Sequence, residues 1–347
     1  MNHWSYAAAG VDIDAADAAK RSMAAGELQH PLVLNRHGAF ASVLAADFAG
    51  YREPVLVMKT EEPGSKQALA LQHGRLESIA QDLVHHLLND IAVMGARPLY
   101  VQDAILCGKL EPGAVSALVA AIAASCLEHG CALTGGETSE QPGVLAAGAY
   151  MLTASAVGVA ERDEVIDGSA IRAGDTVLAL AANGLHTNGY SLVRALLAAQ
   201  PQLLEREVDG EPLLEALLRP HRSYFPLLQG KFGDRRLHGL AHITGGGIAG
   251  NLRRILPAGL DAAVDGARLQ PPALFRLLRD AGQLAEADML RTFNMGVGIA
   301  AVVAPELAAE WIRELADGDC RAWPIGTIVK GTGDVIVSGR IDWRDER

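Results

Sequence analysis

The sequence is poor in aromatic residues and has no block of basic residues. Phe, Trp and Tyr together make up 5% of the 347 residues, and the formal net charge is -11. Proteins that bind duplex nucleic acid usually present clustered Lys and Arg, and those that bind single strands stack bases on aromatic rings. Both absences argue against nucleic acid as a partner.

The sequence also has few cysteines and no long apolar run. The cysteines form no C-x-x-C pair and have no histidine pair at zinc spacing; they are Cys107, Cys126, Cys131 and Cys320. We expect them to be reduced thiols in the cytoplasm. The N-terminal segment MNHWSYAAAG lacks a basic stretch followed by an apolar one, so no signal peptide is predicted. The longest apolar runs are too short to span a membrane.

The length is enough for two domains, and 50% of the residues are hydrophobic, so each domain can build a core. A charged and turn-rich stretch, ERDEVIDGSAIRAGD, is typical of a domain boundary. We therefore predict an N-terminal domain over residues 1–168 and a C-terminal domain over residues 169–347. Short apolar runs alternate with segments of helical periodicity, which predicts an α/β (α+β) fold with sheets covered by helices. The predicted strands are 54–58, 132–134, 152–159, 176–181 and 298–303, and the predicted helices are 76–94, 114–128 and 191–199.

The segment TGGETSEQPG, residues 134–143, places two glycines beside carboxylates directly after an apolar run. Adjacent glycines let the backbone approach a phosphate, and carboxylates can hold the Mg²⁺ that accompanies it. We interpret the segment as a loop that handles a nucleotide. A second glycine-rich loop, TGGG, follows at residues 244–247. Ordinary turns are the alternative interpretation of either loop alone.

The helix predicted over residues 76–94 carries a carboxylate on its apolar face. At 100° per residue, Asp90 lies within about 20° of Leu83, which belongs to the apolar stripe. A carboxylate there is costly unless a cation or donors meet it, and near the helix C-terminus its charge opposes the dipole. We therefore predict a metal or ligand role for Asp90, with a helix-end carboxylate in solvent as the alternative. The adjacent His85 and His86 cannot converge on one metal from one face.

Residues 59–66, KTEEPGSK, follow the apolar strand PVLVM and combine carboxylates, a glycine, a hydroxyl and a lysine. Mg²⁺ and phosphate need these groups, so the segment offers Glu61, Gly64, Ser65 and Lys66 as candidate ligands. The spacing is not that of a P-loop, and a turn with solvated charges is the alternative interpretation.

Three segments of the C-terminal half carry further candidates. NGLHTNGYSLVR contains His186 and Asn188 before a predicted helix, with Ser191 as its predicted N-cap. His186 can act as an acid or base near neutral pH, although a loop histidine is often only a surface donor. AHITGGGIAGN places His242 before three glycines at a helix N-terminus, which suits a phosphate or serves as a hinge. FNMGVG adds Asn294 before an apolar strand.

These segments and several others follow one another in a characteristic order. In sequence they are SYAAAGVDID, YREPVLV, LNDI, CGKL, GGETSEQPG, IDGS, HTNGYSLVR, AHITGGG and RTFNMGVG. In combination they resemble the aminoimidazole ribonucleotide synthetase family of purine biosynthesis, also called phosphoribosylformylglycinamidine cyclo-ligase. The resemblance covers nearly the whole chain, and the combination is specific although no single segment is.

The resemblance implies a ligase that binds ATP with Mg²⁺ and phosphorylates the formamide oxygen of formylglycinamidine ribonucleotide. The amidine nitrogen then closes the imidazole ring, and phosphate leaves. It also implies a two-domain synthetase-like fold and a homodimer. The N-terminal domain would form the shared sheet and the ATP and metal site, and the C-terminal domain would bind the substrate and its phosphate. The implied partners include neither nucleic acid nor a membrane.

The resemblance also assigns roles by position. The implied catalytic residues are His186, Asp90 and Lys66. The implied metal ligands are Asp90, Glu61 and Glu137. The implied nucleotide-binding residues are Glu61, Gly64, Ser65, Lys66, Asn89, Asp103, Gly135, Gly136, Glu137 and Thr138. The implied substrate-binding residues are Asn188, Gly189, His242, Thr244, Gly245, Gly246, Gly247 and Asn294.

Three segments depart from the family pattern. The first phosphate loop usually reads TDGVGTK, whereas here TEEPGSK makes Glu61 the leading carboxylate and introduces Pro63, which has no backbone donor. Ala7 replaces a lysine of the N-terminal arm, and Met151 replaces an aspartate after the GGE segment. The changes fit an active but divergent synthetase. They also fit a paralogue that uses Mg·ATP to activate another small amide or acid, or a non-catalytic nucleotide-binding relative.

Overall fold

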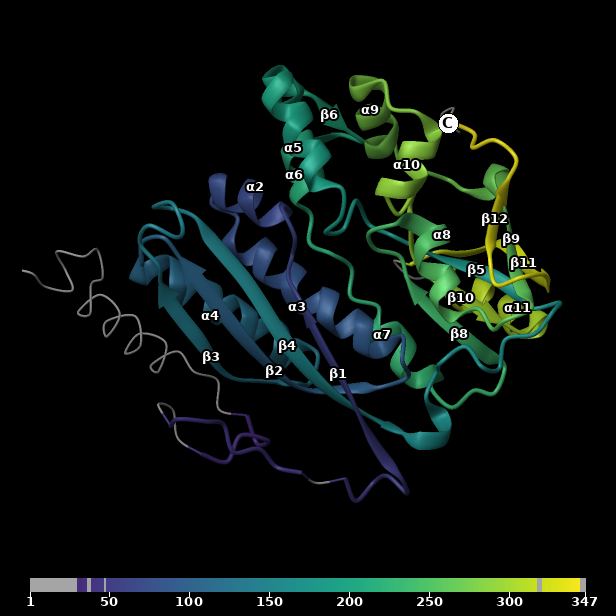
Figure 1. Cartoon of the computed structure of the whole chain (residues 1–347), viewed down its shortest axis with the longest axis horizontal. Coiled ribbons are helices and arrows are strands. Elements are labelled where there is room, and N and C mark those ends of the chain that lie inside the picture. The colour runs from purple at the N-terminus through teal and green to yellow at the C-terminus, as the bar shows by residue number, and fades with distance from the viewer. Residues whose placement is uncertain (1–29, 36–38, 47, 317–319, 344–347) are drawn as a thin grey trace, which may run out of the picture. The chain divides into compact units, whose positions relative to one another are not determined.

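The computed structural model describes residues 30–35, 39–46, 48–316 and 320–343. The chain divides into two compact units, and in Figure 1 the first runs from purple to teal (β4) and the second from teal to yellow. The first unit extends as far as Arg162. The short stretch Ala92–Gly95 is an exception, because it belongs to the second unit. Gly168, where the sequence predicts a boundary, lies shortly after the start of the second unit.

The first unit is a four-stranded sheet with helices against one face (Figure 1). The strands are β1 (Pro54–Glu61), β2 (Arg97–Cys107), β3 (Ala132–Glu140) and β4 (Tyr150–Glu161), in the order β1-β4-β2-β3. β4 pairs antiparallel with β1 and β2, and β2 pairs parallel with β3. The helices are α2 (Lys66–Gln72), α3 (Leu76–Ala92) and α4 (Pro112–Glu128). The parallel pair requires a crossover, which α4 supplies.

The two faces of this sheet are covered unequally. Helix α3 contributes a stripe that includes Leu83 and Ile91, both completely buried, and each such side chain stabilises the fold by about 1.5–3 kcal/mol. Strand β1 alternates between half-buried and exposed residues, so Leu56 and Met58 lie on the opposite face and are 56% and 71% exposed. The edge strand therefore presents an apolar surface that the described residues leave uncovered.

The second unit is built on a six-stranded sheet in the order β12-β9-β11-β5-β10-β8. Neighbouring strands are antiparallel except β12 and β9, which are parallel. The strands are β5 (Thr176–Ala181), β8 (Leu237–His242), β9 (Leu260–Asp265), β10 (Val297–Val303), β11 (Ala322–Lys330) and β12 (Val335–Ser338). A small ribbon joins β6 (Glu207–Val208) and β7 (Glu211–Pro212). Every residue of β10 is buried, as expected for a strand covered on both faces.

Short helices surround this sheet. They are α5 (Tyr190–Ala199), α6 (Leu213–Leu218), α7 (Phe225–Leu228), α8 (Gly247–Leu252), α9 (Ala273–Gly282), α10 (Glu286–Thr292) and α11 (Pro305–Glu314). The 3-10 turns are η2 (Arg162–Glu164), η3 (Pro201–Glu205), η4 (Gln229–Lys231), η5 (Arg253–Ile255) and η6 (Gly266–Arg268). Trp311 of α11 packs into the same apolar core as Leu178 of β5 and Val303 of β10. The central strands and α11 thus share one core.

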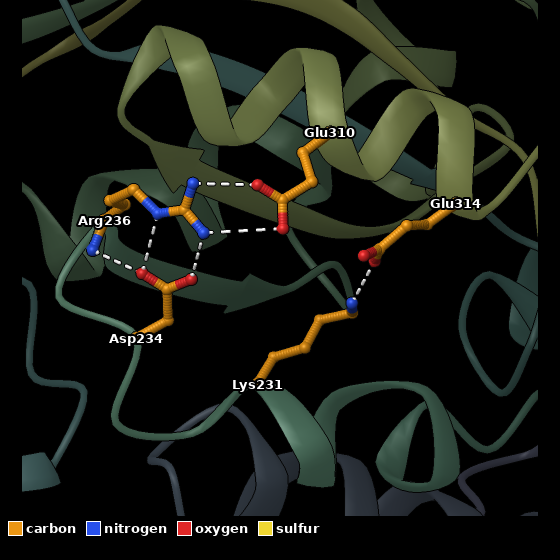
Figure 2. Close-up of polar contacts among 5 residues, drawn as sticks. All are labelled: Lys231, Asp234, Arg236, Glu310 and Glu314. Carbon is orange, nitrogen blue, oxygen red and sulfur yellow. Dashed lines mark hydrogen bonds and ion pairs between the residues drawn. The ribbon is translucent and has the colours of Figure 1, made fainter.

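An ion-pair network joins α11 to the chain just before β8 (Figure 2). Arg236 donates to Asp234 at 2.8 and 3.1 Å and to Glu310 at 2.8 and 3.4 Å. Lys231 pairs with Glu314 one turn further along the same helix. Hydrogen bonds from Arg236 hold the pKa of Asp234 below its usual value. Such partly exposed pairs typically add at most about 1 kcal/mol of stability each.

The predicted α/β fold is confirmed, and three local predictions are wrong. Strand 176–181 matches β5 residue for residue. The predicted loop 134–143 is a strand in its first part, because pairing with β2 carries β3 on to Glu140. Ser191 is not the N-cap, since α5 begins at Tyr190 and follows Gly189, whose φ is 81°. The predicted helix 76–94 ends at Ala92.

The structure also bears on two predictions from the sequence, namely reduced cysteines and apolar runs too short to span a membrane. All four cysteines are free and buried, as expected for reduced thiols. Among the residues that the structure describes, no helix combines the length and the apolar character needed to cross a bilayer.

Candidate functional site

A lysine ammonium lies between two carboxylates in the first unit. The Nζ of Lys59 is 2.6 Å from Glu61 Oε1 and 3.1 Å from Asp90 Oδ2. Burial lowers the pKa of Lys59, but hydrogen bonds to Glu61 and the charge of Asp90 outweigh this effect and raise that pKa. The carboxylate on the apolar face of α3 is therefore met by a cation of the same chain.

Local structure explains why these three side chains meet. Lys59 and Glu61 are two residues apart on β1, so they point to the same face of the sheet. Asp90 lies in the last turn of α3, next to the completely buried Asn89. The sequence identified Glu61 and Asp90 but missed Lys59, because no local pattern shows that a strand lysine reaches a helix carboxylate.

Lys66, predicted to contact a phosphate, is completely buried. Its Nζ lies 2.9 and 2.7 Å from Oδ1 and Oδ2 of Asp82, which is also completely buried. Removing one partner of such a pair typically costs about 3–5 kcal/mol, because the other charge is left in the interior. The pair fixes the start of α2 to α3, and Asp82 is a residue that sequence reasoning missed. The catalytic role of Lys66 stays a prediction.

Gly64 and Ser65 form the turn that leads into α2. Gly64 has a φ of 60°, which glycine adopts without strain, and Ser65 is the residue before the first helical one. Pro63 is buried. The side-chain oxygen of Gln67 accepts a hydrogen bond from the backbone N–H of Leu152 at 2.9 Å. The turn is therefore tied to β4.

Asp103 of β2 and Gly136 of β3 lie opposite each other in the parallel ladder. A Cβ on Gly136 would lie 1.8 Å from Asp103 Oδ1, so only glycine fits beside this carboxyl group. Asp103 is 7% exposed, and burial raises its pKa to about 7. At neutral pH the carboxyl group is thus close to half protonated and can donate as well as accept a hydrogen bond.

The rest of the GGE segment continues along β3 toward solvent. Gly135 has a φ of 125°, Glu137 is exposed, and Thr138 is partly buried. Within the part of the chain that the structure describes, Glu61, Asp90 and Glu137 do not bring their ligand atoms within 4.8 Å of one another. Glu61 and Asp90 are joined through the ammonium of Lys59. The metal role of Glu137 stays a prediction.

Three buried histidines gather in the second unit. His186, His221 and His242 are 2%, 1% and 6% exposed, and one ring nitrogen of each lies within 4.8 Å of the others. The Nε2 of His221 is 3.0 Å from the Nε2 of His242. The ring of His221 also stacks on His186, with centroids 3.9 Å apart and planes inclined by 19°. The sequence predicted His186 and His242 but missed His221, which belongs to none of the glycine-rich segments.

This histidine arrangement suits proton handling better than metal binding. A Zn²⁺ ion sits about 2.0–2.1 Å from each ligand nitrogen, near the plane of its ring, whereas nearly parallel stacked rings do not aim at a shared point. The contact between His221 and His242 requires one ring to carry a proton on Nε2 and the other to accept there. The tautomers of these two rings are therefore linked, next to His186.

A glycine in β10 makes room for this cluster. A Cβ on Gly298 would lie 1.8 Å from the Tyr224 hydroxyl and 2.9 Å from Cε1 of His186. The Tyr224 hydroxyl donates to the carbonyl oxygen of Ala181 at 2.7 Å, and burial raises the pKa of Tyr224 well above its usual value. His186 has a φ of 60°, which is uncommon for a residue other than glycine. The last glycine of FNMGVG is thus needed for close packing of the histidines.

The TGGG segment connects β8 to α8 and is held by one asparagine. The Nδ2 of Asn251 donates to carbonyl oxygens of Thr244, Gly245 and Gly247 at 3.3, 3.2 and 2.9 Å. Its Oδ1 accepts from the Thr244 hydroxyl at 3.2 Å. A Cβ on Gly247 would lie 1.9 Å from a backbone oxygen of α10. The shape of the segment is therefore fixed by the protein itself, and Asn251 is a second residue of the unit that sequence reasoning missed.

The HTNG and FNMGVG segments are locked together. The Nδ2 of Asn294 donates to the carbonyl oxygen of Gly184 at 2.9 Å, and its Oδ1 accepts from the N–H of Gly296 at 2.9 Å. A Cβ on Gly189 would lie 2.2 Å from the ring of Phe293. Asn294 thus has a clear structural role, and its contact with substrate stays a prediction.

The HTNG and TGGG segments also approach each other. A Cβ on Gly245 would lie 3.3 Å from Oδ1 of Asn188. His186 and His242, at the start of each segment, belong to the histidine cluster. The structure therefore brings together the residues that the sequence predicted for substrate binding in this unit.

The departures from the family pattern differ in where they lie. Met151 is 45% exposed on β4, and Pro63 is buried beneath the turn into α2. Ala7 lies outside the described residues, as do its neighbours in SYAAAGVDID.

Two domain descriptions match the chain. "AIR synthase related protein, N-terminal domain" matches residues 45–160, and "AIR synthase related protein, C-terminal domain" matches residues 172–338. Together they cover most of the sequence, one in each structural unit.

Curated relatives match over nearly their full length. The phosphoribosylformylglycinamidine cyclo-ligase of Desulfitobacterium hafniense (strain DSM 10664 / DCB-2) is 45% identical over 307 residues, which cover 87% of this chain and 90% of the relative. The protein of the same name from Carboxydothermus hydrogenoformans is 40% identical over 343 residues, which cover 97% of this chain and 100% of the relative.

Solved structures share the two-domain fold. Thiamine-monophosphate kinase from Stenotrophomonas maltophilia K279a matches with a TM-score of 0.67 at 19% identity, covering 94% of this chain and 97% of that one. The hydrogenase maturation protein HypE in complex with ATP matches with a TM-score of 0.63 at 18% identity, covering 91% and 88%. At such identities the likeness shows the fold alone. The domain matches and the curated relatives show more: the chain belongs to the AIR synthase related family, which includes the phosphoribosylformylglycinamidine cyclo-ligases.

Proposed function

We propose that this protein is the ATP-dependent ligase that converts formylglycinamidine ribonucleotide to aminoimidazole ribonucleotide in purine biosynthesis. The observation that carries the proposal is an identity of 45% and 40%, over most of the chain, to relatives named phosphoribosylformylglycinamidine cyclo-ligase. The amide oxygen of the substrate is a poor leaving group, so its phosphorylation by ATP comes first. The amidine nitrogen then attacks the activated carbon, loses a proton, and expels phosphate as the ring closes.

The carboxylates of the first unit fit a hard cation. Glu61 and Asp90 already bind the ammonium of Lys59 together, and carboxylate oxygens are the ligands that Mg²⁺ prefers. We therefore assign Glu61 and Asp90 to Mg²⁺, which would neutralise the negative charge of the phosphates during transfer. The turn at Gly64 and Ser65 would place backbone N–H groups near those phosphates.

Lys66 has a supporting role in this proposal. Its ammonium is used by Asp82 inside the unit, so it holds α2 in place below the phosphate turn rather than reaching the nucleotide. Asp103, opposite Gly136 in the same sheet, would donate a hydrogen bond to the nucleotide, because a carboxyl group with a pKa near 7 is partly protonated at neutral pH.

The histidine cluster of the second unit supplies an acid–base group. We assign His186 to removal of the proton from the amidine nitrogen as the ring closes. His221 stacks on His186 and shares a hydrogen bond with His242, so it keeps both rings in place. The preformed TGGG segment would bind the ribose phosphate through its backbone N–H groups.

We also propose a homodimer formed through the four-stranded sheet. Leu56 and Met58 expose apolar side chains on the edge strand β1, and Met151 exposes another on the neighbouring β4. Uncovered apolar surface of this kind is typical of an interface.

A paralogue that activates a different small amide or acid is the alternative function. Two observations favour it, namely a lysine between the two proposed metal ligands and a buried proline in the phosphate turn. Both features change the surroundings of the proposed nucleotide site, whereas the segments HTNG, TGGG and FNMGVG of the second unit match the family pattern.

A turnover assay separates the two functions. Purified protein is supplied with Mg·ATP and formylglycinamidine ribonucleotide, and both ADP and aminoimidazole ribonucleotide are followed. Formation of both products in equal amounts is the result expected for the cyclo-ligase. Binding of ATP without formation of the imidazole product contradicts the proposal and favours the paralogue.

A further inference from the structure

Lys59 occupies the place where the proposed metal ligands converge. Its ammonium contacts Glu61 at 2.6 Å and Asp90 at 3.1 Å, so one positive charge already offsets half of the negative charge of the carboxylate pair. Two cations cannot share that place, because a monovalent and a divalent charge a few ångströms apart repel strongly in a half-buried site.

Lys59 also differs from the other lysine of the segment in its freedom to move. Lys66 is completely buried and bound by both oxygens of Asp82. The side chain of Lys59 is 30% exposed, and it lies on the edge strand β1. Of the two ammonium groups of KTEEPGSK, only that of Lys59 can leave its carboxylates and meet a ligand without emptying a buried ion pair.

We propose that Lys59 is a built-in counter-cation that couples metal binding to nucleotide binding. Without nucleotide, its ammonium occupies Glu61 and Asp90 and keeps a divalent cation out. When nucleotide binds, the phosphates accept the ammonium and the two carboxylates become available to the metal. The inference rests on the proposed Mg·ATP site, and it makes Lys59 the lysine of this segment that contacts phosphate.

The test uses two separate titrations of the full-length protein. Mn²⁺ serves as a probe of the metal site and is titrated without nucleotide, and ATP is titrated in EDTA so that no metal is present. Lys59→Met removes the charge and keeps the length of the side chain. We expect it to tighten Mn²⁺ binding by roughly tenfold or more, and to weaken binding of metal-free ATP by roughly fivefold.

Two further variants make the result specific. Lys330→Met removes one exposed charge from the second unit and is expected to change neither titration. Lys59→Arg keeps the charge and is expected to bind Mn²⁺ as weakly as the unmodified protein. If Lys59→Met does not fold, Lys59→Arg still tests the proposal, because Mn²⁺ binding by Lys59→Arg that is tighter than that of the unmodified protein would refute it.

Opposite changes in the two affinities support the coupling. Unchanged or weaker Mn²⁺ binding by Lys59→Met overturns it, and unchanged binding of metal-free ATP overturns the contact with phosphate. Neither titration uses formylglycinamidine ribonucleotide or detects an imidazole product. A chain that passes these titrations and fails the turnover assay therefore refutes the proposed reaction without refuting the role of Lys59.

Discussion

At the scale of single residues, burial separates two Lys–Asp pairs that look alike in sequence. Lys66 and Asp82 are completely buried, so water cannot replace either member of the pair. Lys59 and Asp90 are partly exposed, with side chains 30% and 17% accessible, so water or a ligand can replace either partner. The first pair holds the fold, and the second is the one that can respond to a ligand.

The first prediction concerns Asp90. Asp90→Asn keeps the size of the side chain but removes the charge that Mg²⁺ requires, so we expect turnover to fall by roughly 10²–10³-fold. Mg·ATP should also bind more weakly, while thermal unfolding should change little. Steady-state kinetics and nucleotide titration check this, with Asp280→Asn on the exposed surface of α9 as a control. Kinetics equal to those of the control would remove Asp90 from the metal site.

The second prediction concerns the pH dependence of stability. Burial raises the pKa of Asp103 from 3.8 to about 7, so the folded protein holds this proton more tightly than the unfolded chain does. The stability that Asp103 contributes is therefore fully present below about pH 4 and is lost as the pH rises to about 7. Asp103→Asn cannot ionise, so its stability relative to the unmodified protein should increase across this range by a few kcal/mol.

Urea unfolding at several pH values between 4 and 8 measures that difference. The slope of unfolding free energy against urea concentration should be the same for both proteins if they unfold in the same way. A constant difference between variant and unmodified protein across this range would show that the Asp103 carboxyl group has an ordinary pKa.

Several functional candidates could be predicted from sequence, and others could not, for a physical reason. Asp90 stood out because its charge breaks an apolar stripe, and His186 because it follows a strand in a glycine-rich turn. Lys59, Asp82 and His221 gave no such signal. Each acts through a partner that is distant in sequence, and only the tertiary fold brings the pair together.

At the scale of elements, the pairing of strands overrides local propensity. Glycine, serine and glutamate are poor strand residues, which is why the sequence predicted a loop after Thr134. The ladder from Tyr100 to Cys107 of β2 supplies partners as far as Glu140, and the backbone follows it. Glycine is still needed at 136, where the Asp103 carboxyl group leaves no room for a side chain. The same residues therefore serve the strand and the candidate nucleotide site.

The third prediction belongs to the TGGG segment. Asn251→Ala removes donors to three carbonyl oxygens and the acceptor for the Thr244 hydroxyl, so the segment should lose its fixed shape. If it binds the ribose phosphate, the KM for the ribonucleotide should rise by roughly fivefold, since one net hydrogen bond is worth about 1 kcal/mol. The KM for ATP should stay the same. Equal increases in both KM values would point to general loss of structure instead.

At the scale of the whole molecule, hydrophobic periodicity predicted the α/β class and strands such as 176–181. The family matches agree with the resemblance carried by nine short segments. Assembly is harder to predict, because an exposed apolar residue on a strand looks the same in sequence as a buried one. Only the alternation in β1, with Leu56 and Met58 facing away from α3, shows which apolar residues lack a cover.

The fourth prediction tests that uncovered face as a dimer interface. Met58 is 71% exposed on β1, and Met58→Glu would place two like charges in or near a symmetric contact, which disfavours association. We expect sedimentation velocity at several concentrations to show a dimer for the unmodified protein and a monomer for this variant. Val144 is 77% exposed outside the strands, so Val144→Glu adds the same charge and should remain dimeric. If the nucleotide site depends on the dimer, Met58→Glu should also bind ATP more weakly at low protein concentration. A Met58→Glu variant that sediments as a dimer would place the interface on another surface.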